Sequence, residues 1–306
     1  MSKKKNTIAI YLEYFCFVFA EKALLALPAK IAYFFGQLAA DTVFFLDLKH
    51  RHRAMAHLLH SGIVKNRAEA RSMARKCFRH FGAVMIDIIR IPKEIHESGD
   101  LIKNISLSGS SKGIELFMTN GSARQAIVVM AHFGNWEIAG IGYCCLSGRD
   151  LLTVMRDFDN PLIGKVFMAR RTGYGHKLVT KKGSLKSLIG AVRGGKSVCF
   201  IADQHAGGND GIKLDFFGHP AKVHKSPALL HLKTGVPIFV AVCARTGPMK
   251  YEIRLRDPIM PEEGKDKSVE DVVRAYTSHL ESLILENPEQ WIWPHRRWLD
   301  INRKRR

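Results

Sequence analysis

The chain has 306 residues, of which 46% are hydrophobic and 25% are charged, a composition that excludes an intrinsically disordered protein. Lys and Arg outnumber Asp and Glu by 47 to 28, and the net charge of +19 indicates an anionic partner: nucleic acid, an anionic membrane surface, or an acidic protein or substrate. The six cysteines form no C-x-x-C pair, so we expect neither a disulfide framework nor a zinc site, and no metal is predicted.

Residues 1–48 are predicted to form a membrane-associated helical segment. Hydrophobic and aromatic residues dominate it, and Pro28 divides it into helices at 7–27 and 29–46. Charged residues such as Glu13 and Asp41 interrupt both helices, so neither offers the run of about 20 apolar residues that a spanning helix needs. Basic residues flank the segment on both sides, which favours amphipathic helices in the cytoplasmic leaflet. The alternative is that they cap the core as ordinary helices.

Residues 49–306 are predicted to form a single α/β domain. Residues 50–98 are helical in pattern, with a turn at Ser61 and Gly62 and an end near Pro92. Beyond them, strand-like and helix-like stretches alternate, which predicts a central, mostly parallel mixed sheet flanked by helices. The expected strands are 127–130, 151–155, 177–180, 197–202, 237–243 and 251–255. The expected helices are 135–145, 161–172, 184–192, 226–234 and 269–286.

The most informative segment ends the first of these strands. An apolar run at 127–130 leads to His132, then to a turn containing Gly134 and Asn135, and Glu137 follows five residues after the histidine. If Asn135 caps the next helix, Glu137 lies in its first turn and can approach the imidazole. A neutral imidazole held by a carboxylate is a common general base near neutral pH. The segment therefore predicts a catalytic pair of His132 and Glu137.

Spacing alone does not support that hypothesis, because the chain has 14 histidines. His205 and His295 also have an acidic residue five positions later, and such pairs commonly have only local structural roles. Only His132 follows a strand that looks buried and precedes a capped helix. In α/β proteins, that edge of the sheet is where ligands bind.

Other polar residues follow predicted strands or lie in loops. Arg156 ends a strand, Arg171 closes a helix, and Asp203 and Gln204 precede a glycine-rich loop. A Trp-rich segment at 287–298 lies near the C-terminus. Each has an ordinary alternative, such as a helix-terminal cation, a loop-fixing carboxylate or core packing. Several polar strand ends at one sheet edge nevertheless favour a shared site.

These residues resemble the bacterial lipid A biosynthesis acyltransferases, the lauroyl and myristoyl transferases within the lysophospholipid acyltransferase superfamily. The motifs that carry the resemblance occur in the expected order over nearly the whole chain. They are HFGNWE at 132–137, an arginine followed by Asn-Pro at 156–161, ADQ at 202–204, FFGHPA at 216–221 and NPEQWIWPHRRW at 287–298.

The resemblance implies an O-acyltransferase of the HX4E type, with His132 as the general base and Glu137 orienting the imidazole. It assigns Arg156, Arg171, Asp203 and Gln204 to substrate binding. Two further groups are assigned by chemistry. Arg296 and Arg297 suit phosphates because guanidinium groups bind them bidentately, and Arg156 or the backbone amides around Gly134 and Asn135 are candidates to stabilise an oxyanion.

The resemblance also implies the substrates and the location. The donor is an acyl carrier thioester, from acyl carrier protein or coenzyme A, and no other cofactor is expected. The acceptor is a hydroxyl of a phosphorylated glucosamine lipid, acylated late in lipopolysaccharide biosynthesis at the cytoplasmic face of the anionic inner membrane of a Gram-negative bacterium. Acyl chain length, the acceptor hydroxyl and the oligomeric state stay open.

Two other interpretations differ in acceptor or in class. A related acyltransferase could act on a lysophospholipid, another glycolipid or an aminolipid, but the Pro-Glu-Gly-Thr block of the glycerolipid branch is absent from the sequence. A non-catalytic basic protein could bind nucleic acid or a membrane and would gather its cations on one face with stacking aromatics. Here the cations are spread along the chain and Phe is concentrated in the apolar start, so no nucleic-acid partner is predicted.

Overall fold

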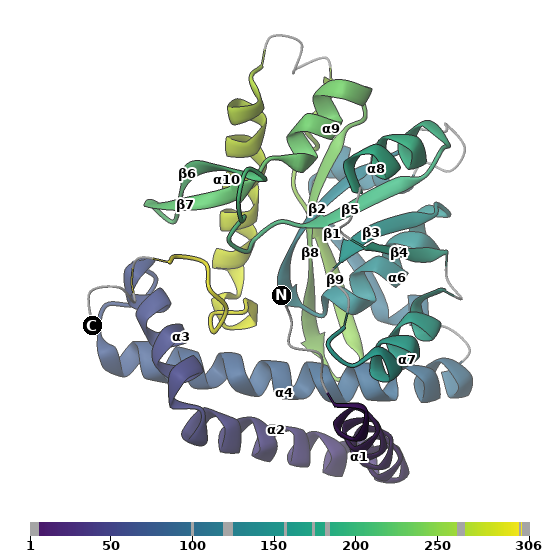
Figure 1. Cartoon of the computed structure of the whole chain (residues 1–306), viewed down its shortest axis with the longest axis vertical. Helices are drawn as coiled ribbons and strands as arrows, with labels where there is room; N and C mark the ends of the chain where they lie inside the picture. The colour runs from purple at the N-terminus through teal and green to yellow at the C-terminus, as the bar shows by residue number, and fades with distance from the viewer. Residues whose placement is uncertain are drawn as a thin grey trace.

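The computed structural model describes residues 6–98, 101–118, 125–155, 158–172, 175–180, 184–261, 267–299 and 301. A seven-stranded sheet lies at its centre (Figure 1). In spatial order the strands are β1 (Ile105–Gly109), β9 (Lys250–Leu255), β8 (Ile238–Gly247), β2 (Ile127–Gly134), β5 (Ser197–Ile201), β3 (Leu151–Met155) and β4 (His176–Thr180). Neighbouring strands are parallel except for β8 and β9, so the predicted mostly parallel α/β sheet is confirmed.

Helices cover both faces of this sheet. In chain order they are α1 (Thr7–Ala26), α2 (Ala29–Leu46), α3 (Leu48–His60), α4 (Arg67–Ser98), α5 (Ser111–Met118), α6 (Trp136–Ser147), α7 (Pro161–Thr172), α8 (Ser184–Arg193), α9 (Ser226–Thr234) and α10 (Val269–Glu286). Along the lower edge of Figure 1, α2 packs beneath α4, and α1 contacts both α4 and α7. Helix α4 therefore separates the two N-terminal helices from the sheet.

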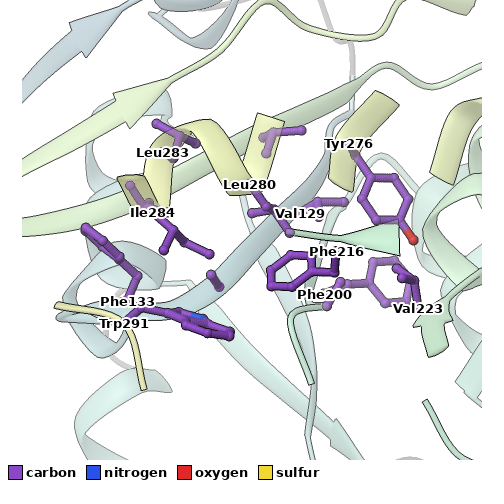
Figure 2. Packing of buried hydrophobic residues seen from close by; sticks show 14 of the residues in the cluster. Val129, Phe133, Phe200, Phe216, Val223, Tyr276, Leu280, Leu283, Ile284 and Trp291 are labelled. Carbon is purple, nitrogen blue, oxygen red and sulfur yellow. The ribbon is translucent and has the colours of Figure 1, made fainter. Parts of the chain in front are cut away.

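The core follows from the alternation of side chains along buried strands. Successive residues of a strand point to opposite faces, and β2 is apolar on both. Val129 packs on one face in the cluster that contains Leu280 and Ile284 of α10 (Figure 2). Val128 belongs to the cluster on the other face, together with Ile138 of α6. A strand covered on both sides in this way holds its C-terminal residues rigidly.

Three features differ from the sequence prediction. Helix α4 continues through Pro92 to Ser98, although an end near Pro92 was expected. Strand β1 and helix α5 were not predicted. The region expected to be a glycine-rich loop also contains a hairpin of β6 (Gly211–Phe216) and β7 (His219–His224), which pair only with each other. Phe217 and Gly218 at its turn both have positive φ, the geometry of a tight hairpin turn.

Polar contacts tie the N-terminal helices to the rest of the fold. The buried carboxylate of Asp87 on α4 accepts two hydrogen bonds from Arg245 on β8, at 2.7 and 3.2 Å, and one from the hydroxyl of Tyr33 on α2. Asn160 caps α7 and donates through Nδ2 to the carbonyl oxygen of Ile10 in α1, at 2.9 Å. The first two helices are therefore anchored at specific points.

Within the described ranges, no single helix is both long and apolar enough to cross a membrane. Helices α2 and α3 meet the length and hydropathy criteria only as a pair, and they are bent by 88° at the break between them.

Candidate active site

His132 lies near the carboxyl end of β2, where the pairing with β8 shifts register between Met130 and Gly134. Such irregularities re-aim side chains and are common beside active sites. Neighbouring residues of β2 are buried, whereas 20% of the His132 side chain is exposed. The imidazole is thus held in a rigid strand but remains accessible.

The carboxylate of Asp203 holds this imidazole. Met130 of β2 is paired with Ile201 of β5, so the chain segments that follow these two parallel strands run side by side. Oδ1 of Asp203 lies 2.8 Å from Nδ1 of His132, and Oδ2 accepts the backbone N–H of His132 at 2.8 Å. Trp291 donates through Nε1 to the same Oδ2 at 2.7 Å. The buried carboxylate therefore has three nitrogen partners.

These contacts define the ionisation of Asp203 and the tautomer of His132. Burial alone would raise the pKa of the Asp203 carboxyl, but its charge interaction with His132 and the three hydrogen bonds outweigh burial and lower the pKa. A carboxylate at Nδ1 places the ring proton on that nitrogen. Nε2 then carries the free lone pair, which a general base requires.

The carboxylate at Nδ1 is therefore not the one that the spacing predicted. Glu137 lies in the first turn of α6, as expected, and is half-buried. The position that orients the imidazole is filled by Asp203, which the resemblance had assigned to substrate binding. Sequence distance explains the difference: Asp203 lies 71 residues from His132 and reaches it only because β2 and β5 are neighbours.

Gln204 and two aromatic rings surround the imidazole. Nε2 of the Gln204 amide lies 3.2 Å from each ring nitrogen of His132, an equidistant position that is not in line with either lone pair. The ring of Trp136 stands at 67° to the imidazole with centroids 5.3 Å apart. His295 lies parallel to it at 6.4 Å. Gln204 was predicted to belong to the site, and it lies there.

The turn after His132 depends on Gly134 and Asn135. Gly134 has φ +55°, and a Cβ at this position would lie 1.9 Å from the carbonyl oxygen of Cys243. Asn135 is buried and caps α6, because its Oδ1 accepts the N–H of Ile138 at 3.3 Å. Its own N–H donates to the carbonyl oxygen of Cys243 at 2.9 Å, so this amide is not available to an oxyanion. The expected turn role is confirmed, and the oxyanion role of Asn135 is corrected.

The C-terminal segment closes the other side of the site. Ile292 donates its N–H to the carbonyl oxygen of His132 at 3.1 Å, and Trp291 forms a bridge with Phe133. Trp291 is the site residue that sequence analysis missed, since its segment was also compatible with core packing. A Trp-rich segment bordered by arginines beside a predicted site was the available signal.

The two arginines of this segment have different environments. Arg297 was expected to bind phosphate, but it is buried, and its Nη1 donates to the carbonyl oxygens of Gln204 and Lys222 at 3.0 and 3.1 Å. Burial lowers its pKa to about 10. Its guanidinium also lies 4.3 Å from the ring centroid of Phe216, so it fastens the Gln204 segment to the β6–β7 hairpin.

Arg296 is exposed, as a phosphate-binding residue must be. Burial and then repulsion by Arg296 lower the pKa of Arg53 on α3. Arg53 also donates to the carbonyl oxygen of Pro294 at 3.1 Å. Of the other predicted residues, Arg156 lies outside the described residues. Arg171 lies in the last turn of α7, and its side chain is not among those that the structure describes.

An apolar cavity of about 840 Å³ lies beside this site, between α1, α2 and α4. Ile292 and Pro294 line it, and Ile292 is hydrogen-bonded to the backbone of His132. Phe81 also lines it and packs at 5.8 Å against Trp136, whose ring contacts His132. The lining of the cavity is therefore one contact away from His132, through Ile292 and through Trp136. Among the residues that the structure describes, no group of three His, Cys, Asp or Glu side chains could hold a metal ion.

Comparison with known proteins gives consistent matches. The model of the family described as bacterial lipid A biosynthesis acyltransferase matches residues 1–300. A lipid A biosynthesis acyltransferase of Haemophilus influenzae is 24% identical over 253 residues, 80% of this chain and 74% of that protein. A phosphatidylinositol mannoside acyltransferase of Mycolicibacterium smegmatis is 22% identical over 60% of each chain. The lipid A biosynthesis palmitoleoyltransferase of Escherichia coli is 26% identical over 57% of this chain and 56% of its own.

Proposed function

The chain belongs to the bacterial lipid A biosynthesis acyltransferase family, and on that premise we propose that it transfers a fatty acyl group from a carrier thioester to a hydroxyl of a lipid A precursor. This is a late, secondary acylation in lipopolysaccharide biosynthesis. The observation that carries the proposal is the His132–Asp203 pair, with an apolar cavity nearby whose lining residue Ile292 is hydrogen-bonded to the backbone of His132.

In the first step, Nε2 of His132 removes the proton of the acceptor hydroxyl as its oxygen attacks the thioester carbonyl carbon. An alcohol has a pKa far above 7, so a positioned base contributes about 10²–10⁴-fold to the rate. Asp203 keeps the imidazole in the required tautomer and stabilises the imidazolium that forms. Glu137, in the first turn of α6, remains a proposed second acid of the site.

In the second step, the tetrahedral oxyanion collapses and the carbon–sulfur bond breaks. The thiolate takes the proton from the imidazolium, which leaves an ester, a free thiol and a neutral His132. The N–H of Trp136, at the first position of α6, has no acceptor within its helix and is a candidate oxyanion donor. Arg156 and the amide of Gly134 are the other candidates.

The cavity beside His132 suits the acyl chain of one substrate. Its lining is almost entirely aliphatic and aromatic, so a fatty chain gains burial there without leaving a polar group unpaired. The reactive carbonyl would lie toward Ile292, the lining residue that is hydrogen-bonded to the backbone of His132. The depth of this cavity would then set the preferred chain length.

The exposed cations suit the charged part of the substrates. Arg53 donates to the carbonyl oxygen of Pro294, two residues before the exposed Arg296, and guanidinium groups bind phosphates bidentately. We assign them to the phosphorylated glycolipid, with Gln204 and Arg171 as further substrate-binding residues. The donor is an acyl thioester of acyl carrier protein or of coenzyme A. The proposal includes no other co-substrate. The reaction takes place at the cytoplasmic face of the inner membrane.

One alternative acceptor has support of its own. Relatives of this chain include phosphatidylinositol mannoside acyltransferases, which match about 60% of its length. The same base and cavity would serve that chemistry with a different glycolipid or lysophospholipid. The acceptor therefore needs a direct test.

Mass spectrometry of cellular lipids separates the two acceptors. Cells that lack the gene are compared with cells complemented by the wild type, His132→Ala or His279→Ala, the last a matched change on α10 away from the site. We expect lipid A to lose one secondary acyl chain on deletion, and the wild type and His279→Ala to restore it. Unchanged lipid A with an altered glycolipid or phospholipid would move the acceptor to the alternative.

The donor and the catalytic base are tested with purified enzyme. Acyl carrier protein and coenzyme A thioesters of the same fatty acid are compared as donors. His132→Ala should lower kcat by at least about 10²-fold while the protein remains folded. A folded His132→Ala protein with wild-type turnover would contradict the proposed mechanism.

A further inference from the structure

The apolar cavity between α1, α2 and α4 contains one polar pair. Among the described residues that line the cavity, only Asp47 and His50 have polar side chains. Oδ2 of Asp47 lies 2.6 Å from Nδ1 of His50, and Oδ1 accepts the backbone N–H of the same residue at 3.0 Å. The side chains of Asp47 and His50 are 37% and 43% exposed, so a ligand can reach them. Neither residue takes part in the proposed acyl transfer.

The pair has the same chemistry as His132 and Asp203. Asp47 caps α3, and hydrogen bonds from the backbone and then the ring of His50 keep the pKa of its carboxyl below the usual value. A carboxylate at Nδ1 of a neutral imidazole places the ring proton there and leaves Nε2 as a hydrogen-bond acceptor. Within the described part of the chain, Nε2 of His50 has no hydrogen-bond partner. This nitrogen therefore suits an N–H or O–H group of a ligand.

Asp47 and His50 lie at one end of the cavity. The last two turns of α1 supply lining residues, and they connect directly to the start of α2. Asp47 and His50 follow the other end of α2, a helix of 18 residues that is about 27 Å long. In Figure 1, α1 and α3 accordingly lie at opposite ends of α2. A chain in the cavity would therefore have its two ends near different helices.

The end beside α3 is the one connected to His132. Arg53, one turn after His50 on the same helix, donates to the carbonyl oxygen of Pro294 at 3.1 Å. Pro294 and Ile292 both line the cavity, and Ile292 is hydrogen-bonded to the backbone of His132. On the proposed function, on which this inference rests, the thioester carbonyl lies toward Ile292. The group that follows the sulfur then leaves the cavity past His50.

From this arrangement we propose that His50, oriented by Asp47, is a specificity-determining residue that accepts a hydrogen bond from the first amide N–H of the donor's thiol arm. In acyl carrier protein and in coenzyme A, this arm begins with the sulfur, an ethylene link and an amide. The amide is thus the first hydrogen-bond donor beyond the reactive carbonyl. Nε2 of His50 can accept from it, whereas the neighbouring Arg53 can only donate. The pair therefore favours a carrier thioester over a simple alkyl thioester.

Binding of unreactive thioethers tests this role without acyl transfer. Two ligands carry the same dodecyl chain and sulfur. One continues as N-acetylcysteamine, and the other has an ester oxygen in place of the amide N–H. Calorimetry with the full-length protein compares their dissociation constants at pH 8. From the usual net contribution of a neutral hydrogen bond, we expect the wild type to prefer the amide by about two- to tenfold.

Substitutions of the pair should change this preference in different ways. His50→Leu removes the acceptor, so the two ligands should bind equally. His50→Gln keeps an acceptor oxygen near the position of Nε2 and should retain part of the preference. In Asp47→Asn the oxygen still caps α3, but the NH₂ group faces Nδ1, so Nε2 becomes a donor and the preference should be lost. Because the cap is kept, Asp47→Asn tests the role even if His50→Leu is unstable.

His52→Leu is the matched control on the same helix. His52 is exposed and does not belong to the cavity lining, so this variant should keep the wild-type preference. A wild-type protein that binds both ligands equally would overturn the role of His50, and so would a preference that survives His50→Leu. Either result leaves the proposed reaction standing, since acyl transfer is measured separately. If neither ligand bound, this inference and the assignment of the cavity to the donor chain would both fail.

Discussion

The indole Nε1 of Trp291 donates a 2.7 Å hydrogen bond to Oδ2 of Asp203, the carboxylate whose other oxygen holds the imidazole of His132. Both residues are buried, and no turn of the chain brings them together, because 88 residues separate them. In the proposed mechanism the indole of Trp291 therefore acts on the imidazole through Asp203, as a positioning residue.

Trp291→Phe should disturb this arrangement with little change in packing. A hydrogen bond to a charged group contributes about 1.5–3 kcal/mol, so we expect a loss of that size in the free energy of unfolding. A carboxylate with fewer donors holds the imidazolium more tightly, so the acid limb of the pH–rate profile should move to higher pH while kcat falls. Denaturant titration and pH–rate profiles measure both effects.

Trp293→Phe is the matched control. Trp293 is equally buried and packs 4.5 Å from Trp291, but its Nε1 donates to the carbonyl oxygen of Pro288. This variant should lose some stability and keep the wild-type pH–rate profile. A profile that moves equally in both variants would show that packing, and not the bond to Asp203, is responsible.

Asp203→Asn should have a larger effect on catalysis. Asparagine has one acceptor oxygen and an NH₂ group, so it cannot accept hydrogen bonds from His132 and Trp291 on two separate oxygens as Asp203 does. The same replacement in a Ser-His-Asp triad leaves the wrong imidazole tautomer and lowers kcat by about 10⁴-fold. We expect a loss of about 10³–10⁴-fold in kcat with little change in KM. A loss of less than tenfold would return the orienting role to Glu137.

Acid stability follows from the lowered pKa of Asp203. A carboxyl group whose pKa is lower in the folded state stabilises the protein above its unfolded pKa of about 4, and this contribution is lost as pH falls through the folded value. Asp203→Asn lacks that contribution at every pH. The stability gap between wild type and variant, measured by urea unfolding, should therefore narrow below about pH 4. A gap independent of pH would contradict the ionised state of Asp203.

Gly134→Ala should destabilise the turn that presents His132. The positive φ of Gly134 and the distance of 1.9 Å from an added Cβ to the backbone of Cys243 both disfavour a side chain at this position. We expect the two effects together to lower the free energy of unfolding by about 2–5 kcal/mol. Gly218→Ala isolates the effect of positive φ, because its Cβ would meet nothing within 4 Å. Gly207→Ala has neither problem and should be nearly neutral in thermal unfolding. Similar losses in all three variants would argue against the close contact.

The part of the fold that was predictable from sequence is the part governed by local rules. The apolar run of β2 and the capping residue Asn135 each leave a short-range pattern, and both elements form where expected. The β6–β7 hairpin was missed because its turn is Phe217–Gly218 in place of the usual Asn-Gly signal. Pro220, the second residue of β7, also argues against a strand, although a strand that pairs on one side only tolerates it.

The site was predictable up to the point where neighbouring strands had to be known. His132 and Asp203 were each identified as polar residues after a strand. Their direct contact depends on the pairing of β2 with β5, which no local pattern encodes. The burial of Arg297 likewise follows from its contact with the β6–β7 hairpin. Its charge alone suggested phosphate binding, whereas its buried side chain binds backbone carbonyl oxygens.

Ala23→Phe tests whether the cavity holds the acyl chain. Ala23 of α1 lines the cavity, and a phenyl ring there would shorten the space that is available to a fatty chain. Each methylene group that no longer fits costs about 0.8 kcal/mol, or roughly four-fold in kcat/KM. We therefore expect the preference to shift to shorter donors, with little effect on the shortest ones. A series of saturated acyl carrier thioesters measures the profile.

Ala26→Phe provides the control for this change. Ala26 ends the same helix and is exposed, but it does not belong to the cavity lining. This variant adds the same ring to α1 and should keep the wild-type chain-length profile, even if membrane binding strengthens. Because both variants alter the apolar face of α1 equally, a shift confined to Ala23→Phe must come from the cavity. Identical profiles in the two variants would place the acyl chain elsewhere.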